Sequence, residues 1–117
     1  MKLVKLALCA LLALSVPALA NTPDAAGFAY RNITTATTTT VKTGQGVIHE
    51  ICINTPAASG VVVVYDNTAG SGTKVGTITN PATLLGEGPV CAFHDIALTK
   101  GLTIVTTGSQ DITVVYH

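Results

Sequence analysis

From residue 27 onward, short apolar runs alternate with clusters of turn-forming residues, and no run shows the spacing of a helix. Residues 47–54 alternate between apolar and polar positions, which predicts a strand. Strict alternation puts Val47, His49, Ile51 and Ile53 on one face and Ile48, Glu50, Cys52 and Asn54 on the other. Val61–Tyr65 is apolar throughout, which is typical of a central strand covered on both faces.

Seven or eight short strands are expected, separated by glycine, proline, asparagine and aspartate. They cover residues 27–32, 34–42, 47–54, 61–65, 74–79, 90–98, 102–106 and 112–116. The threonine-rich stretch at 34–43 is interpreted as an exposed edge strand, and the run 90–98 is expected to bend near Asp95. The pattern predicts an all-β fold, an antiparallel β-sandwich of either the immunoglobulin-like or the jelly-roll type.

The N-terminus follows a different pattern. Two lysines precede an apolar run at 6–16, and the stretch ends in the small residues Ala18 and Ala20. These are the three parts of a secretory signal. A helix needs about 20 apolar residues to cross a bilayer, and this run is shorter. We therefore predict a cleavable signal peptide at 1–20, a single β-sandwich domain at 21–117, no stable membrane anchor after cleavage, and a periplasmic or extracellular location.

The charge of the chain argues against nucleic acid as a partner. After cleavage four basic and six acidic residues remain, a net charge of about −2 with the histidines neutral. Such a chain has no basic patch and few aromatic rings, which argues against nucleic-acid binding. Nineteen threonines take the place of charged surface residues. Threonine is β-branched and carries a hydroxyl, so it suits the solvated face of a strand.

Cys52 and Cys91 remain after the signal peptide, which takes Cys9 with it. An even number of cysteines in an exported domain predicts a disulfide, and two unpaired buried thiols are the alternative. A bond between Cys52 and Cys91 would close the loop of residues 53–90. Closing a loop of that size stabilises the folded protein by about 3–4 kcal/mol in the chain-entropy model. Redox catalysis would need a closely spaced pair such as C-x-x-C, which this sequence lacks.

The candidate metal ligands are the three histidines, His49, His94 and His117. Glu50 and Asp95 directly follow two of them, so in a strand each acid points away from its neighbouring histidine. His49 and His94 would meet only if their strands are neighbours, which a bond between the two cysteines would favour. They are therefore weak metal candidates, and half-buried histidines bonded to backbone or threonine are the alternative. No cofactor is expected.

Catalytic signatures are missing from the sequence. Ser59, Ser71 and Ser109 lie in glycine-bearing loops and outside any G-x-S-x-G motif. The six acids are scattered, and most flank turns, where solvated carboxylates are ordinary. Asp66-Asn67 has too few acidic neighbours for a calcium loop and is explained by turn chemistry. We interpret the protein as a non-enzyme with no catalytic residues.

Six strand-and-turn segments carry a resemblance to a known group of proteins. They are Val41–His49, Ile51–Thr55, Val64–Thr68, Gly72–Val75, Asp95–Gly108 and Asp111–Val114. In this order they resemble small β-sandwich proteins encoded by tailed phages and prophages, most of them described as structural or hypothetical. The resemblance covers residues 30–116 and implies a β-sandwich with a structural role, in some cases on the virion. The export signal and the cysteine pair set this chain apart from virion proteins assembled in the cytoplasm.

Two functions are consistent with these features. The leading hypothesis is an exported structural or interaction module, phage-derived or virion-associated. It would bind a protein partner or itself through strand edges or through loops 55–60, 66–73 and 80–89. The alternative is an extracellular carbohydrate- or ligand-binding β-sandwich. Its aromatic platform would come from Phe28, Tyr30, Tyr65, Phe93 and Tyr116. The sequence does not specify which residues bind.

Overall fold

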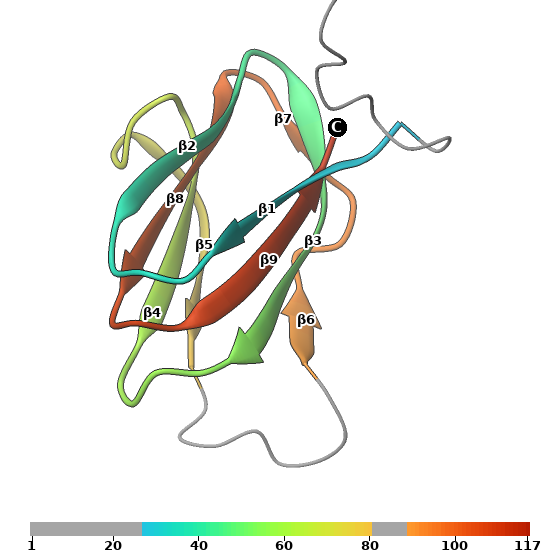
Figure 1. The fold of residues 1–117 in the computed structure, drawn as a ribbon. Helices are drawn as coiled ribbons and strands as arrows, with labels where there is room; N and C mark the ends of the chain where they lie inside the picture. The colour runs from blue at the N-terminus through green and yellow to red at the C-terminus, as the bar shows by residue number, and fades with distance from the viewer. Residues whose placement is uncertain (1–26, 81–88) are drawn as a thin grey trace, which may run out of the picture.

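The computed structural model describes residues 27–80 and 89–117, which form nine β-strands. Their bounds are β1 Ala29–Ile33, β2 Thr38–Thr43, β3 Gly46–Thr55, β4 Val61–Asp66, β5 Thr73–Thr79, β6 Val90–Ala92, β7 Ile96–Leu98, β8 Gly101–Thr107 and β9 Asp111–Tyr116. Two antiparallel sheets pack against each other (Figure 1), so the predicted all-β sandwich is confirmed. The predicted signal peptide at 1–20 lies outside the described residues. Within those residues, no helix has the length and apolar character needed to span a membrane.

The strands pair in a nested order. β1 pairs with β9, β2 with β8, β3 with both β6 and β7, and β4 with β5. One sheet therefore runs β1-β9-β3-β6, with β7 also on β3, and the other runs β2-β8-β4-β5. This nested pairing across two sheets is that of a jelly-roll. The immunoglobulin-like alternative is wrong, because its first two strands share a sheet, whereas β1 and β2 lie in different sheets here.

The apolar core fills the space between the two sheets. Its buried members are Ile33, Ile48, Ile51, Ile53, Val62, Val64, Leu98, Leu102, Ile104, Ile112 and Val114. Most of them come from β3, β4, β8 and β9, which are the central strands of their sheets. Central strands have neighbours on both sides, so their inward side chains are the best shielded from water.

The alternation expected for residues 47–54 is wrong, and a β-bulge explains why. Ile48 pairs with Tyr116 and Glu50 pairs with Val115, so His49 is an extra residue in β3. An extra residue resets the alternation of the strand. As a result Ile48 and Ile51 are both fully buried in the core, although strict alternation places them on opposite faces.

β4 lies between β8 and β5, as expected for a central strand. The expectation that both of its faces are covered is wrong. Its burial alternates: Val62 and Val64 are fully buried, whereas Val61, Val63 and Tyr65 are only half-buried. In a two-layer sandwich each sheet has only one face against the core, so the outer valines keep contact with solvent.

β2 is the edge strand of its sheet, as predicted, and among the described strands it pairs only with β8. It begins at Thr38 rather than at residue 34, because residues 34–37 form the crossing from one sheet to the other. The Thr106 hydroxyl donates to the backbone oxygen of Thr35 across 2.7 Å and anchors this crossing to β8. Lysine and threonine side chains with a bulge at Val41 make the edge irregular, which disfavours uncontrolled strand addition.

The expected strand 90–98 is divided into β6 and β7, and the predicted bend near Asp95 is confirmed. Phe93 and Asp95 both have left-handed backbone conformations, with φ of 59° and 54°. Non-glycine residues adopt this region rarely, so the three-residue link is sharply turned. The Phe93 ring packs partly buried against the core and lies against Gly76 of β5, where a Cβ would come within 2.5 Å of it.

Candidate functional site

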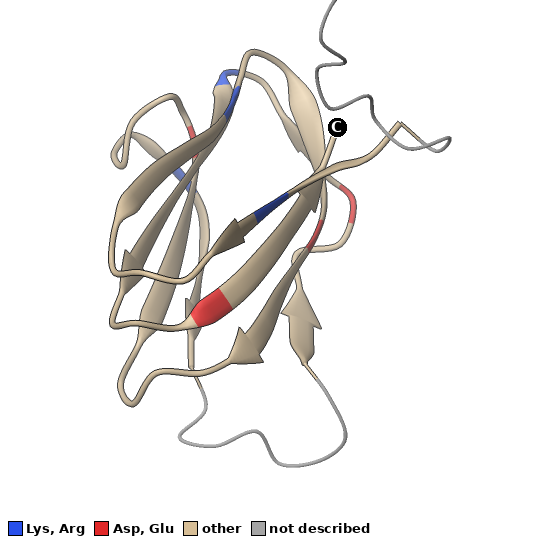
Figure 2. Ribbon diagram, viewed as in Figure 1, with Lys and Arg blue, Asp and Glu red and all other residues tan. Residues whose placement is uncertain are grey.

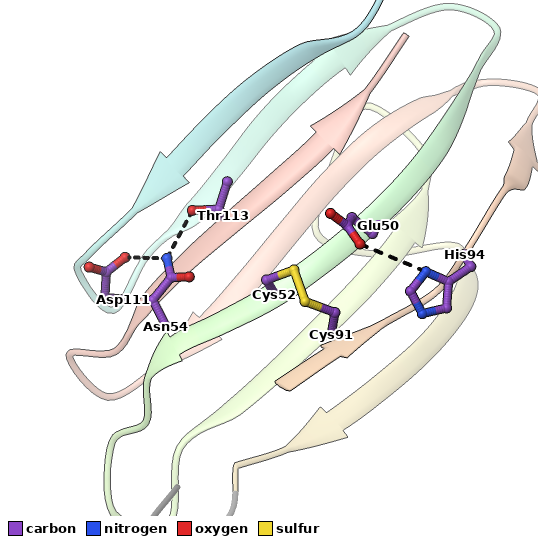
Figure 3. Close-up of a disulfide and its surroundings, with 7 residues drawn as sticks. All are labelled: Glu50, Cys52, Asn54, Cys91, His94, Asp111 and Thr113. Carbon is purple, nitrogen blue, oxygen red and sulfur yellow. Dashed lines mark hydrogen bonds and ion pairs between the residues drawn. A yellow bond between two sulfur atoms is a disulfide. The ribbon is translucent and has the colours of Figure 1, made fainter. Parts of the chain in front are cut away.

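The outer face of the β1-β9-β3-β6 sheet carries the most concentrated chemistry in the described part of the chain (Figure 3). Strand alternation points Tyr30 and Asn32 of β1 outward, because Ile33 faces the core. The same reasoning points Cys52 of β3 and Thr113 of β9 outward, between buried isoleucines and valine. A disulfide, an amide-carboxylate cluster and a histidine–carboxylate pair therefore share one surface.

The predicted disulfide is confirmed. Cys52 and Cys91 are direct partners in the register of β3 and β6, with their Cα atoms 4.0 Å apart, and their sulfur atoms are bonded. The bond ties the three-residue strand β6 to the ten-residue strand β3. Such a bond persists in an oxidising environment and not in the cytoplasm, so it indicates a non-cytoplasmic location.

Four polar side chains form a hydrogen-bonded cluster beside the disulfide. Asp111 Oδ1 accepts bonds from the amide nitrogens of Asn32 at 2.6 Å and Asn54 at 3.0 Å, and Asn54 also donates to the Thr113 hydroxyl at 2.8 Å. Donation by Asn54 and then by Asn32 lowers the pKa of Asp111 below its usual value. Sequence reasoning missed this cluster, because its members come from three strands that are distant along the chain.

The two candidate histidines lie beside different acids. His49 Nδ1 lies 2.8 Å from Asp95 Oδ1, and His94 Nδ1 lies 3.9 Å from Glu50 Oε2. His49 lies on β3, and His94 lies in the link between β6 and β7, both of which pair with β3. The two histidines are therefore close, as a shared metal site requires, yet each pairs with the acid that follows the other one. The alternative expectation was that the histidine rings bond to backbone or threonine. It is not observed, because the partners of the two rings are the carboxylates of Asp95 and Glu50.

Two aromatic rings, those of Phe28 and His117, lie near His49 at this end of the sheet. The ring centroid of His49 lies 4.4 Å from that of Phe28, and Phe28 meets His117 edge-on at 5.5 Å. His117 also exchanges backbone hydrogen bonds with Val47, at 2.9 and 3.0 Å. The C-terminal residue therefore extends the pairing of β9 with β3 beyond the bulge at His49. Phe28 thus packs against the ring of His49 and leaves 40% of the His49 side chain exposed.

Asp66 is a second acid whose role the sequence did not reveal. It is buried, at 8% exposure, and it accepts hydrogen bonds from the backbone nitrogens of Thr99, Lys100 and Gly101 and from the Thr99 hydroxyl. The backbone donor of Lys100 and those of its neighbours lower the pKa of Asp66 to about 2. Its oxygens serve the chain itself, so this carboxylate is a structural anchor and not a solvated turn residue.

Two of the three loops proposed for binding lie at opposite ends of the sandwich. Residues 55–60 lie at one end of the sandwich, where Asn80 donates its backbone N–H to the Gly60 carbonyl at 2.8 Å. The 66–73 hairpin lies at the opposite end and contacts residues 99–101 (Figure 1). Of the loop 80–89, residues 81–88 lie outside the described ranges. A shared binding site formed by all three loops is therefore not supported.

Elsewhere the described surface is weakly charged. Lysine, arginine, aspartate and glutamate are sparse and spread over both sheets (Figure 2). A small cleft of about 270 Å³ lies where β1 crosses to β2. Its lining consists of Arg31, Asn32, Ile33, Thr34, Thr35, Thr37 and Thr39. Typical small-molecule sites have about 300–1,000 Å³ and mostly apolar walls, so this cleft does not resemble one.

Comparisons with known proteins add no relative. The chain matches no protein-family model, no curated protein and no solved structure. The fold itself hosts many unrelated functions, so the jelly-roll topology alone does not identify one. The functional interpretation therefore depends on the chemistry of the surface just described.

Proposed function

We propose that the protein is an exported, non-enzymatic interaction module that binds a protein partner or a second copy of itself through the β1 edge of its sandwich. The observation that carries this proposal is Tyr30, a residue that is 74% exposed on that edge strand. Exposure of a large aromatic side chain to water is energetically unfavourable, and such side chains are enriched at protein interfaces. A strand edge adds unpaired backbone groups that a partner strand can bond.

The β1 edge is better suited to binding than the other edges. β2 carries a bulge at Val41 and β5 has a register shift opposite Tyr65, and such irregularities hinder regular strand addition. β6 and β7 have only three residues each, and such short edge strands offer few backbone groups to a partner strand. β1 has five residues in unbroken register with β9 from Ala29 to Ile33.

Sedimentation velocity over a range of concentrations tests self-association, and co-sedimentation with cells and with phage particles tests binding to surfaces. Tyr30→Lys should abolish the observed association, because it removes the ring and adds a charge to the edge. Val90→Lys is the matched control, since Val90 is the other large exposed apolar residue of the described chain, at 47%, and lies on β6. A protein that stays monomeric and binds neither surface contradicts the proposal.

The second candidate function is carbohydrate binding, and a specific arrangement supports it. Tyr30 and Asn32 project from the same face of β1, so the exposed ring and the polar cluster of Asn54, Asp111 and Thr113 lie on one face of the sheet. Sugars commonly stack an apolar face on an aromatic ring while their hydroxyls bond amide and carboxylate groups. Within the cluster, both amide groups donate to Asp111 Oδ1, so Oδ2 is available to accept from a sugar hydroxyl.

A glycan array with the wild type, Tyr30→Ala and Asn54→Ala separates the two candidates. Carbohydrate binding requires a signal that both substitutions reduce, because ring and cluster would contact the same sugar. Protein association through the β1 edge should respond to Tyr30→Ala and remain unchanged in Asn54→Ala. An array without signal removes the carbohydrate candidate.

The origin of the module is part of the proposal. The order of strand-and-turn segments between residues 30 and 116 resembles phage-encoded β-sandwich proteins, and the jelly-roll topology is common among viral capsid domains and lectins. Both observations support descent from a phage structural protein that now acts outside the cytoplasm. Location of the gene among phage morphogenesis genes, rather than in a bacterial secretion or adhesion cluster, would strengthen this origin.

A further inference from the structure

The two disulfide sulfurs and two side chains beside them provide four potential metal ligands on the outer face of the sheet (Figure 3). A carboxylate oxygen of Glu50 and the sulfur atoms of Cys52 and Cys91 all lie within 4.8 Å of one another. His94 Nδ1 lies 3.9 Å from Glu50 Oε2. Two sulfurs, an imidazole nitrogen and a carboxylate oxygen are the atom types that bind zinc in proteins.

His94 reaches this group because its two neighbours are fixed. Phe93 places its ring against the core and Gly76, while Asp95 bonds to His49 through its side chain at 2.8 Å and through its backbone nitrogen at 3.1 Å. Both neighbours adopt left-handed backbone conformations. This costly conformation turns the residue between them toward Glu50, and such strain is often found where a side chain has a function.

We propose that reduction of the disulfide converts this group into a binding site for one zinc ion, with Cys52, Cys91, His94 and Glu50 as its ligands. Tetrahedral zinc binds thiolate at about 2.3 Å and imidazole or carboxylate at about 2.0–2.2 Å. A carboxylate oxygen of Glu50 and the two sulfurs already lie within 4.8 Å of one another, and His94 Nδ1 lies 3.9 Å from Glu50 Oε2. Rotation of exposed side chains closes the remainder, since the side chain of His94 is 63% exposed and that of Glu50 is 34% exposed.

The redox balance of this conversion is simple. A phosphine takes oxygen from water and becomes its oxide, and the two electrons it gives up break the bond between the two sulfurs and leave two thiols. Zinc binding then displaces one proton from each thiol, because the thiolate is the ligand. Reoxidation by a disulfide oxidant restores the bond and releases the ion. Metal and disulfide are therefore mutually exclusive at these two sulfurs.

The test is titration of the phosphine-reduced protein with Co²⁺, followed by competition with Zn²⁺. Tetrahedral cobalt with thiolate ligands gives a charge-transfer band in the near ultraviolet and intense visible bands. Both should appear at one equivalent in the reduced wild type and be absent from the oxidised protein. His94→Ala and Glu50→Gln should each weaken affinity by about tenfold or more and alter the visible bands.

His117→Ala is the matched control, because the ring of His117 contacts Phe28 and His117 is neither a ligand nor a chain neighbour of His94. It should bind cobalt like the wild type. Circular dichroism of each reduced protein without metal shows whether its fold persists, and a chain that folds only on adding Zn²⁺ also supports the site. The proposal is overturned if the reduced wild type gives no thiolate band, or if His94→Ala and Glu50→Gln bind cobalt as tightly as the wild type.

Discussion

Asp66 at the end of β4 accepts three contacts from Thr99: the backbone nitrogen lies 3.0 Å from both carboxylate oxygens, and the hydroxyl lies 2.8 Å from Oδ2. Thr99 begins the tight turn between β7 and β8, which lie in different sheets. The carboxylate therefore connects the β4–β5 hairpin with a crossing between the sheets. It supplies the acceptors that the backbone N–H groups of this turn would otherwise lack.

Asp66→Asn should lower the free energy of unfolding near neutral pH by about 2 kcal/mol. The amide has one acceptor oxygen in place of two, carries no charge, and turns an N–H₂ toward backbone donors. Chemical denaturation at pH 7 measures the loss. Asp95→Asn is the control, because the carboxylate of Asp95 is 73% exposed and its pair with His49 should contribute at most about 1 kcal/mol.

The same residue predicts a specific acid sensitivity. The pKa of Asp66 falls from 3.8 to about 2 on folding, so the ionised form stabilises the protein at pH values above 3.8. This contribution is lost as the pH falls from 3.8 to about 2. The difference in unfolding free energy between wild type and Asp66→Asn should therefore shrink across that interval. A difference that stays constant down to pH 2 contradicts the assignment.

Gly76→Ala should destabilise the protein by about 1–3 kcal/mol through overpacking. Its Cβ would lie 2.5 and 2.6 Å from two ring carbons of Phe93, which is held in place by the turned link between β6 and β7. Thermal denaturation of Gly76→Ala, Phe93→Ala and the double variant forms a cycle. The alanine at 76 should cost much less when Phe93 is absent, and additive effects would show that the ring is not the obstacle.

Cys52→Ala should lower the midpoint of unfolding clearly under oxidising conditions and hardly at all under reducing ones. The bond joins residues 39 positions apart, and a cross-link of that span stabilises by about 3–4 kcal/mol in the chain-entropy model. Cys91→Ala should behave in the same way, because either substitution removes the same bond. Equal losses with and without reductant would mean that the bond contributes nothing in solution.

The predicted signal peptide implies a defined mature N-terminus. Mass spectrometry of the protein recovered from the periplasm or medium should give Asn21 as its first residue, with the two cysteines bonded. Deletion of residues 2–20 should keep the chain in the cytoplasm with reduced thiols, because that compartment disfavours disulfides. Recovery of the intact chain from Met1 in the cytoplasm would contradict the prediction.

The sequence by itself determined the fold class, most strand positions and the cysteine pair. These depend on local information: the two-residue period of strands, the turn-forming residues between them, and an even number of cysteines in a chain with an export pattern. The bend near Asp95 and the edge position of the threonine-rich stretch were also predictable. The edge position follows from local composition, since polar β-branched residues suit an exposed edge.

Only the tertiary structure decided between jelly-roll and immunoglobulin-like pairing, because strand pairing depends on which distant segments bury each other's apolar faces. The bulge at His49 was invisible for the same reason: it is defined by the partner strand, and it alone allows Ile48 and Ile51 to face one core. Asp66 looks like a turn residue until the fold brings it to backbone donors 33 or more positions away. A hydrogen bond over that distance leaves no periodicity in the chain, so the role of the buried carboxylate emerges only when the sheets pack. The group of side chains at the disulfide emerges only when β3 and β6 pair.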